Sequence, residues 1–275
     1  MALFDAHCHW QDPRLATLDW PAVVEELSVQ GLRYVVVNGT HPGDWAAVQD
    51  MAHRFPKVVR PVYGVHPWRA SRSDLPVGWA DDLRKRLRAD SQASVGEVGL
   101  DRWIEPRDEA AQEMVFRTSL AIAREHDRPV TVHCLRAWGW LLKVLREVGP
   151  PRRFLVHSVN AAPEVIAQLA DMGAFFSVSG AFADEAKPKY HRALRSIPLD
   201  RLLVETDAPD MLAPAGWRRG EARDPATGKA VTHPVDLAGV YAFVGERLGL
   251  AQDELEARVA GNFARCFGPE PPAAG

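Results

Sequence analysis

The 275-residue sequence predicts an α/β protein with the fold of a (β/α)8 barrel, or TIM barrel. Eight short apolar runs alternate with segments of helical periodicity, which is the pattern of right-handed parallel crossovers. The length agrees, since such barrels take about 250 residues as one domain. No Gly-x-Gly-x-x-Gly follows a predicted strand, so a doubly wound open sheet, the main alternative, has little support. We therefore expect one barrel domain over residues 1–275.

The first half of the chain contains four predicted strands separated by three predicted helices. The helix at 20–30 has Val23, Val24 and Leu27 at helical spacing, and Gly31 stands where a helix would end. Residues 34–37 form a β-branched run without charge, which is typical of a strand buried on both faces. The expected strands are 3–10, 33–39, 58–65 and 93–100, and the other helices are 43–54 and 76–89.

The second half repeats this alternation and completes the predicted barrel. The expected strands are 129–134, 153–157, 175–179 and 202–207, and the helices before them are 106–126, 137–147, 163–171 and 186–196. Residues 211–232 are rich in Gly, Pro, Arg and Asp and predict a long loop. Helices at 235–248 and 253–266 follow, and the Pro- and Ala-rich residues 269–275 are expected to form a frayed tail.

Composition excludes several classes of protein. The formal net charge of -3 does not suit a protein that wraps duplex nucleic acid, although a local cationic mouth is compatible with it. The three cysteines, Cys8, Cys134 and Cys266, are far apart and odd in number, which favours reduced thiols. The sequence has no signal-peptide pattern at its start and no apolar run of membrane-spanning length. We expect a cytoplasmic protein that does not bind membranes.

Ionisable side chains gather at the carboxyl ends of the predicted strands, where barrel active sites form. His7 and His9 are two residues apart in a strand and so face the same side, although such a pair alone is a weak signal. Burying many ionisable groups together is costly unless a cation neutralises them. The sequence therefore predicts a metal site whose ligands are His7, His9, Glu97, His133, His157 and Asp207.

The ligand types narrow the metal without identifying it. Imidazole and carboxylate groups without thiolates suit divalent Zn, Mn, Ni, Co or Fe, and a carboxylate-rich half also suits Mg. Six ligands exceed one closed tetrahedral site, so one to two ions per chain are expected, with Glu97 in the bridging position. Glu205, two residues before Asp207, is expected to orient a ligand rather than to be one.

Several motifs resemble those of the TatD family of metal-dependent deoxyribonucleases and related hydrolases. They are Asp5-Ala6-His7-Cys8-His9, Gly64-Val65-His66-Pro67, Gly96-Glu97-Val98-Gly99-Leu100-Asp101, Ser177-Val178-Ser179-Gly180, Glu205-Thr206-Asp207-Ala208-Pro209 and Gly261-Asn262-Phe263-Ala264-Arg265. The resemblance implies a TIM barrel of the amidohydrolase kind, the metal ligands named above, and His66 as a contact to a substrate phosphate. Leu135 stands where the family usually has an arginine, and Arg136 follows it.

We expect a metal-dependent phosphodiesterase that acts on single-stranded DNA or DNA ends, with Asp207 as the general base and Glu97 as the bridging catalytic carboxylate. Arg136, Arg218 and Arg219 are candidate phosphate contacts. Two alternatives remain open: hydrolysis of a small ester, amide or lactone, and a non-catalytic metal-binding barrel. Aromatic residues follow several strand ends and are expected either to stack on bases or to pack loops on the rim; they are Trp10, Trp68, Trp103 and Trp138.

Overall fold

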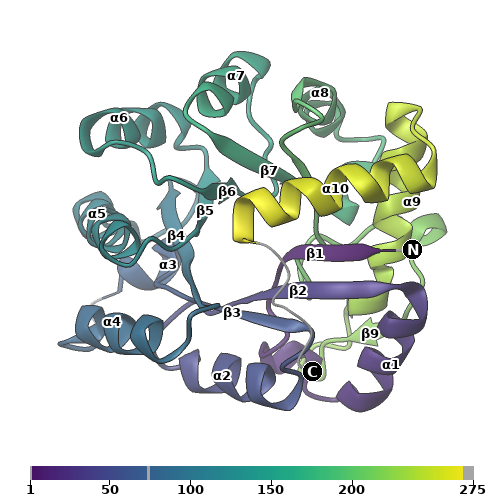
Figure 1. Cartoon of the computed structure of the whole chain (residues 1–275), viewed down its shortest axis with the longest axis horizontal. Coiled ribbons are helices and arrows are strands. Elements are labelled where there is room, and N and C mark those ends of the chain that lie inside the picture. The colour runs from purple at the N-terminus through teal and green to yellow at the C-terminus, as the bar shows by residue number, and fades with distance from the viewer. Residues whose placement is uncertain (1, 73–74, 269–275) are drawn as a thin grey trace.

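The computed structural model describes residues 2–72 and 75–268, and in these ranges it is a (β/α)8 barrel. Eight parallel strands form one sheet in chain order, with helices around the outside (Figure 1). The strands are β1 (Leu3–Cys8), β2 (Leu32–Asn38), β3 (Val59–Tyr63), β4 (Ser94–Asp101), β5 (Val130–Leu135), β6 (Phe154–Val156), β7 (Ala174–Val178) and β8 (Leu202–Val204). The predicted fold class is confirmed.

The helices form where the sequence supplies both an apolar face and end signals. In α1 (Trp20–Gln30) the Asp19 side chain accepts a hydrogen bond from the Ala22 amide, and Gly31 ends the helix with a φ of 96°. The remaining helices are α2 (Trp45–Arg54), α3 (Pro67–Ala70), α4 (Trp79–Ala89), α5 (Glu109–Glu125), α6 (Trp138–Val148), α7 (Pro163–Asp171), α8 (Pro188–Ser196), α9 (Leu237–Leu248) and α10 (Gln252–Phe267).

The segment between β3 and β4 differs from its prediction. The helix expected from residue 76 begins at Trp79, because Gly78 has a φ of 83° and does not continue a right-handed helix. The short helix α3, which was not predicted, follows β3 directly. Its first turn is capped by His66, whose Nδ1 accepts a hydrogen bond from the Trp68 amide at 3.1 Å. This cap fixes the orientation of the His66 ring.

The residues after β8 are mostly the predicted loop, with two short additions. Residues 215–217 form a turn of 3-10 helix, and β9 (Ala222–Arg223) pairs with β10 (Ala230–Val231) as a small antiparallel hairpin. The predicted tail at 269–275 lies outside the described residues. Within 2–72 and 75–268, no helix combines the length and apolar character needed to cross a membrane.

Backbone hydrogen bonds join the first strand to the segment after the last one. The Asp207 amide donates to the His7 carbonyl at 2.9 Å, and the His9 amide donates to the Ala208 carbonyl at 2.8 Å. These bonds alternate between the two segments, as they do between parallel strands. The seam therefore brings His7, His9 and Asp207 to the same end of the barrel.

Helix α10 covers this seam from outside the barrel, beside β1 (Figure 1). The Phe263 ring packs against the Phe4 ring with 4.7 Å between centroids. The buried Asn262 amide donates to the carbonyl of Leu202 in β8 at 2.7 Å and to that of Leu199 at 2.9 Å. The Asn262-Phe263 pair of the last motif therefore holds the barrel closed.

Candidate metal centre

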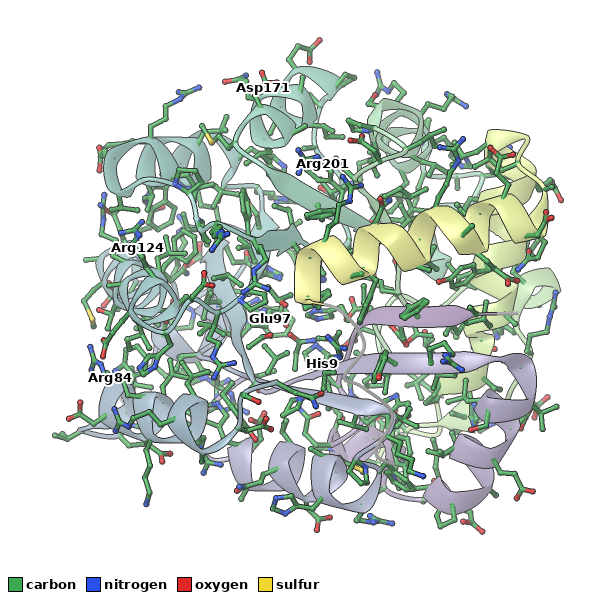
Figure 2. The ribbon with its side chains drawn as sticks, in the orientation of Figure 1. His9, Arg84, Glu97, Arg124, Asp171 and Arg201 are labelled. Carbon is green, nitrogen blue, oxygen red and sulfur yellow. The ribbon has the colours of Figure 1, made fainter. Side chains whose placement is uncertain are left out.

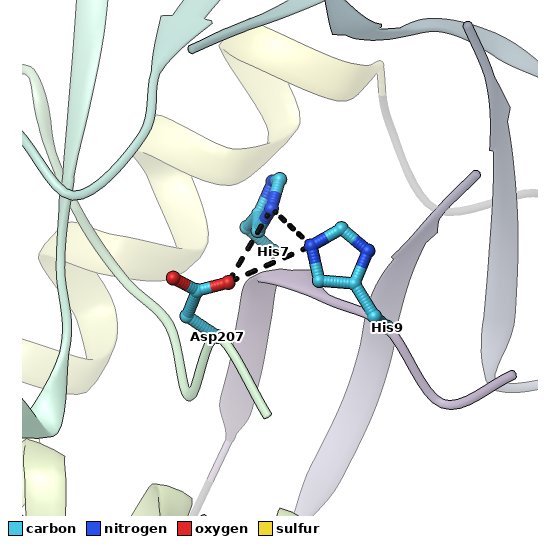
Figure 3. Close-up of side chains that lie close together, drawn as sticks. All are labelled: His7, His9 and Asp207. Carbon is cyan, nitrogen blue, oxygen red and sulfur yellow. Dashed lines mark hydrogen bonds and ion pairs between the residues drawn. The ribbon is translucent and has the colours of Figure 1, made fainter. Parts of the chain in front are cut away.

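His7 and His9 lie at the carboxyl end of β1 and direct their ring nitrogens to one point (Figure 3). The two Nε2 atoms are 3.2 Å apart, and Asp207 Oδ1 lies 3.6 and 3.7 Å from them. The His9 Nδ1–H donates to the Asn38 carbonyl at 2.7 Å, because a carbonyl can only accept. In the neutral ring this bond places the lone pair on Nε2, the form that binds a metal.

Glu97 lies between two groups of imidazoles. Figure 2 shows Glu97 and His9 near the middle of the barrel. Its Oε2 is 3.4 and 3.3 Å from the Nε2 atoms of His7 and His9. Its Oε1 is 2.9 Å from His133 Nδ1 and 2.8 Å from His157 Nε2. Each carboxylate oxygen thus faces a different pair of histidines, which is the arrangement of a bridging carboxylate.

A glycine in β4 permits the close approach that brings Glu97 to His133. A Cβ atom added to Gly99 would lie 1.9 Å from the His133 carbonyl oxygen. Any other residue at this position would push β4 away from β5. The second glycine of the Gly-Glu-Val-Gly motif therefore has a steric role at the centre.

His133 is oriented by a carboxylate whose role the sequence prediction missed. Asp101, fully buried at the end of β4, accepts from His133 Nε2 at 3.1 Å, from the Trp68 indole at 2.7 Å and from the Trp103 amide at 2.6 Å. Burial raises the pKa of Asp101, but these hydrogen bonds outweigh burial and hold it at about 2. Because His133 Nε2 donates to a carboxylate, its Nδ1 presents a lone pair to Glu97 and His157.

His66 also faces the centre, but it presents a hydrogen-bond donor there instead of a lone pair. Its Nδ1 accepts from the Trp68 amide, and burial lowers the pKa of His66 to about 4, so the neutral ring bears its proton on Nε2. That Nε2 lies 3.3 Å from Glu97 Oε1. His66 therefore points a hydrogen-bond donor into the centre, which suits contact with an anionic oxygen better than metal ligation.

The separations between these atoms fit divalent metal ions. With metal–ligand bonds of about 2.1 Å, neighbouring ligands lie about 3.0 Å apart in an octahedral site and about 3.4 Å apart in a tetrahedral one. The contacts of Glu97 and of the His7–His9 pair span 2.8 to 3.4 Å. The six side chains predicted as ligands come together, and the donor set of imidazoles and carboxylates fits one to two ions.

Electrostatics gives an independent reason for a cation. Glu97, Glu205 and Asp207 are all buried beside one another. Burial, together with the charges of Glu205 and Glu97, raises the pKa of Asp207 well above its ordinary value, although His157 and His9 oppose this. Burial raises the pKa of Glu97 as well, but the surrounding histidines outweigh burial and hold it well below its ordinary value. A bound divalent ion would favour the ionised form of Asp207 in the same site.

Two further buried carboxylates hold the ligands from behind. Glu205 accepts from the Ser177 hydroxyl and lies 3.8 Å from His157 Nδ1. Its orienting role stays a prediction, because Glu205 also forms a group with His7 and His157 whose possible ligand atoms lie within 4.8 Å of one another. Asp5, whose role was not predicted, accepts from the Thr206 amide at 3.0 Å and from its hydroxyl at 2.5 Å. The two carboxylates that sequence reasoning missed are therefore Asp5 and Asp101. The alternation of faces along a strand could have indicated both, since Asp5 shares a face with His7 and Asp101 shares a face with Glu97.

The predicted phosphate-binding arginines differ in their surroundings. Arg218 Nε donates to the Ala213 carbonyl at 2.7 Å, and Arg219 Nη1 donates to the Arg218 carbonyl at 3.1 Å. Both guanidinium groups thus bond to their own loop. Arg136 is exposed at the end of β5, with its guanidinium carbon 5.8 Å from the centre of the Trp103 ring. Arg136 is therefore the predicted cation with the clearest access to a ligand.

The barrel and this buried set of histidines and carboxylates define a metal-dependent hydrolase. The chain belongs to the TatD family, since the family model described as TatD related DNase matches residues 4–268. It is 30% identical over 270 residues to the uncharacterized metal-dependent hydrolase YcfH of Escherichia coli K12, covering 97% of this chain and 96% of the relative.

Two other comparisons bear on activity and fold. The chain is 31% identical over 196 residues to the 3'-5' ssDNA/RNA exonuclease TatD of Edwardsiella piscicida, covering 70% of this chain and 75% of that protein. The crystal structure of the TatD homologue YJJV from Escherichia coli K12 superposes with a TM-score of 0.83 at 24% identity, covering 96% of this chain and 97% of that one. The second comparison supports the barrel fold alone.

Proposed function

We propose that this protein is a metal-dependent nuclease that hydrolyses phosphodiester bonds at the ends of single-stranded DNA. The observation that carries the proposal is the position of Glu97, whose two oxygens face separate sets of imidazoles at the barrel mouth. Glu97 and these imidazoles would hold a pair of divalent ions, and such a pair would support in-line displacement at phosphorus. The relative named as a single-strand exonuclease supports the same substrate class.

The roles of the protein groups follow from their atoms. Divalent ions bound here would lower the pKa of water toward 7 and offset charge on the phosphoryl oxygens. Asp207, whose Oδ1 faces His7 and His9, would accept the proton of the attacking water. His66 Nε2–H would donate to a phosphate oxygen, because its Nδ1 is already held by the Trp68 amide.

A small ester, amide or lactone is the second candidate substrate. It is favoured by the loop after β8, where the guanidinium groups of Arg218 and Arg219 bond to backbone carbonyls of their own loop. Arginines held in this way are less available to a phosphate backbone. The experiment below therefore measures both classes of substrate.

The test compares hydrolysis by protein stripped with a chelator and then reloaded separately with Mg, Mn, Zn, Ni, Co and Fe(II). Substrates are single-stranded oligonucleotides labelled at the 3' or the 5' end, a blunt duplex, a small phosphodiester and an uncharged ester panel. We expect metal-dependent release of nucleotides from single strands faster than from the duplex. Faster turnover of uncharged esters than of DNA would favour the second candidate, and no metal-dependent turnover of any substrate would favour a non-catalytic barrel.

The variant Asp207→Asn tests the proposed base. Asparagine keeps the shape of the side chain but loses its basicity, so turnover should fall by at least about 10²-fold. The matched control is Asp171→Asn, an exposed aspartate at the end of α7 on the outside of the barrel (Figure 2). Native turnover by Asp207→Asn would show that Asp207 is not the base.

A further inference from the structure

The segments after β3 and β4 place two exposed indoles at the rim of the metal centre. Trp68 is 47% exposed and Trp103 is 58% exposed, whereas Trp10, which also follows a strand, is only 1% exposed. Exposing a large aromatic ring to water is unfavourable, so an exposed tryptophan beside a site is a candidate ligand contact. The structure thus separates rim tryptophans that pack inside the protein from those that do not.

Both tryptophans are tied to the centre through one carboxylate, Trp68 by its indole and Trp103 by its backbone amide. Asp101 Oδ2 accepts from the Trp68 indole and from the ligand candidate His133, and Asp101 Oδ1 accepts from the Trp103 backbone amide. The rim and the centre are therefore fixed relative to each other. The Trp68 ring also packs edge-on against His66, with 4.7 Å between centroids and an interplanar angle of 74°. Trp68 forms part of the inner wall of the site.

Trp103 is held differently, because its side chain carries only one described ring contact. The Arg136 guanidinium carbon lies 5.8 Å from its ring centre, and more than half of the residue's surface is exposed to solvent. Among the described residues, Arg136 forms no ion pair with a carboxylate, whereas the neighbouring Arg102 is held by Glu109 at 3.0 Å. The Arg136 guanidinium, which has no carboxylate partner among the described residues, thus lies over the Trp103 ring at the mouth.

We propose that Trp103 and Arg136 form a nucleotide subsite, in which the Trp103 ring stacks on an unpaired base and Arg136 binds the adjoining phosphate. This inference rests on the proposed nuclease function and specifies its substrate. Base and phosphate lie next to each other in a nucleotide, as ring and guanidinium do here. Bases inside a duplex are already stacked on their neighbours, so the subsite selects single strands and frayed ends.

The experiment uses the metal-loaded full chain and oligonucleotides that differ only in their bases. One single strand is intact, and the others have an abasic tetrahydrofuran residue at one of the three positions nearest the cleaved end. Trp103→Ala should raise KM for the intact strand about 5- to 150-fold, the usual effect of losing one stacked base. For the strand that lacks the stacked base, wild type and Trp103→Ala should have equal KM values.

Companion variants separate stacking from structural damage. Trp103→Phe keeps an aromatic face and should restore most of the KM, and Arg136→Met should reduce the salt dependence of binding by about 0.7 log units per lost phosphate contact. Arg152→Met is the control for Arg136→Met, and Val29→Ala is the control for Trp103→Ala. Both control residues precede strands, at the end of the barrel opposite the mouth. These controls should leave KM unchanged.

Three results would overturn the inference. Equal losses on intact and abasic strands would show that Trp103 acts structurally, and an unchanged KM for Trp103→Ala would show that it does not contact the substrate. Hydrolysis of a small phosphodiester, with none of any oligonucleotide by wild type, would refute the proposed nuclease function and the subsite together. The first two results leave the nuclease function standing, so the two failures are distinguishable.

Discussion

Replacing Asp101 by asparagine should weaken metal binding even though Asp101 is not itself a predicted ligand. All three groups that contact its carboxylate are donors: His133 Nε2, the Trp68 indole and the Trp103 amide. An asparagine amide has one acceptor oxygen and one donor nitrogen. Whichever way it is turned, its NH2 group faces at least one of these donors.

The magnitude follows from what His133 does at the centre. Its Nδ1 lies 2.9 Å from Glu97 Oε1 and 3.2 Å from His157 Nε2, and it has a lone pair only while Nε2 holds the proton. Loss of the carboxylate removes the preference for that tautomer. Comparable changes behind metal-binding histidines cost about 10- to 100-fold in metal affinity. We expect a loss in that range for Asp101→Asn.

The assay is a titration of chelator-stripped protein with Zn²⁺ or Mn²⁺, followed by calorimetry or by competition with a chromophoric chelator. Far-UV circular dichroism of the stripped variant checks that the barrel is folded, and Asp171→Asn is the control for a neutralised surface aspartate. A folded Asp101→Asn protein with wild-type metal affinity would refute the argument that Asp101 sets the tautomer of His133.

Four further outcomes are expected. Glu97→Gln should reduce the metal content measured by mass spectrometry, because a neutral amide is a poor ligand for two metal ions at once. An unchanged metal content would contradict a bridging role for Glu97. Chelator should lower Tm in calorimetry, since ions bound to the folded form stabilise it, and an equal Tm would count against resident ions. Asn262→Ala should lower the free energy of unfolding, measured in urea, by about 1–3 kcal/mol, because it leaves buried carbonyls unpaired. An unchanged free energy of unfolding would show that Asn262 does not help to close the barrel. Burial raises the pKa of Asp12, but hydrogen bonds from Arg14 outweigh burial and hold this pKa below its ordinary value of 3.8. The loss of Tm caused by Asp12→Asn should therefore become smaller as pH falls below about 4. A loss of Tm that does not depend on pH would refute this linkage.

The strands could be predicted because their composition differs so clearly from that of the rest of the chain. Val35, Val36 and Val37 are fully buried, as expected for a parallel strand covered on both faces. Helix starts were less accurate: the helix predicted from residue 76 begins only at Trp79, because Gly78 has a left-handed backbone conformation. Such conformations depend on tertiary packing that periodicity does not register.

The residues of the metal centre were likewise predicted only in part. Histidines that end strands are conspicuous in sequence, and the structure brings the predicted ligand candidates together. Asp101 and Asp5 were missed because a buried carboxylate is recognised by its partners, and most of these partners come from other parts of the barrel. For Asp5 the partner is Thr206, 201 residues away in the chain. Which side chains meet at such a distance depends on strand register, and this is known only once the barrel is assembled.

The seam between β1 and the segment after β8 links metal binding to the topology of the whole chain. His7 and Asp207 belong to the first and the last strand regions, and they meet only when the Asp207 amide bonds to the His7 carbonyl. During synthesis, a chain that has emerged only as far as β7 contains five of the six ligand candidates and lacks Asp207. An ion held by His7, His9 and Asp207 would therefore fasten the first strand to the segment after the last one, and its uptake would report that the ring of strands has closed.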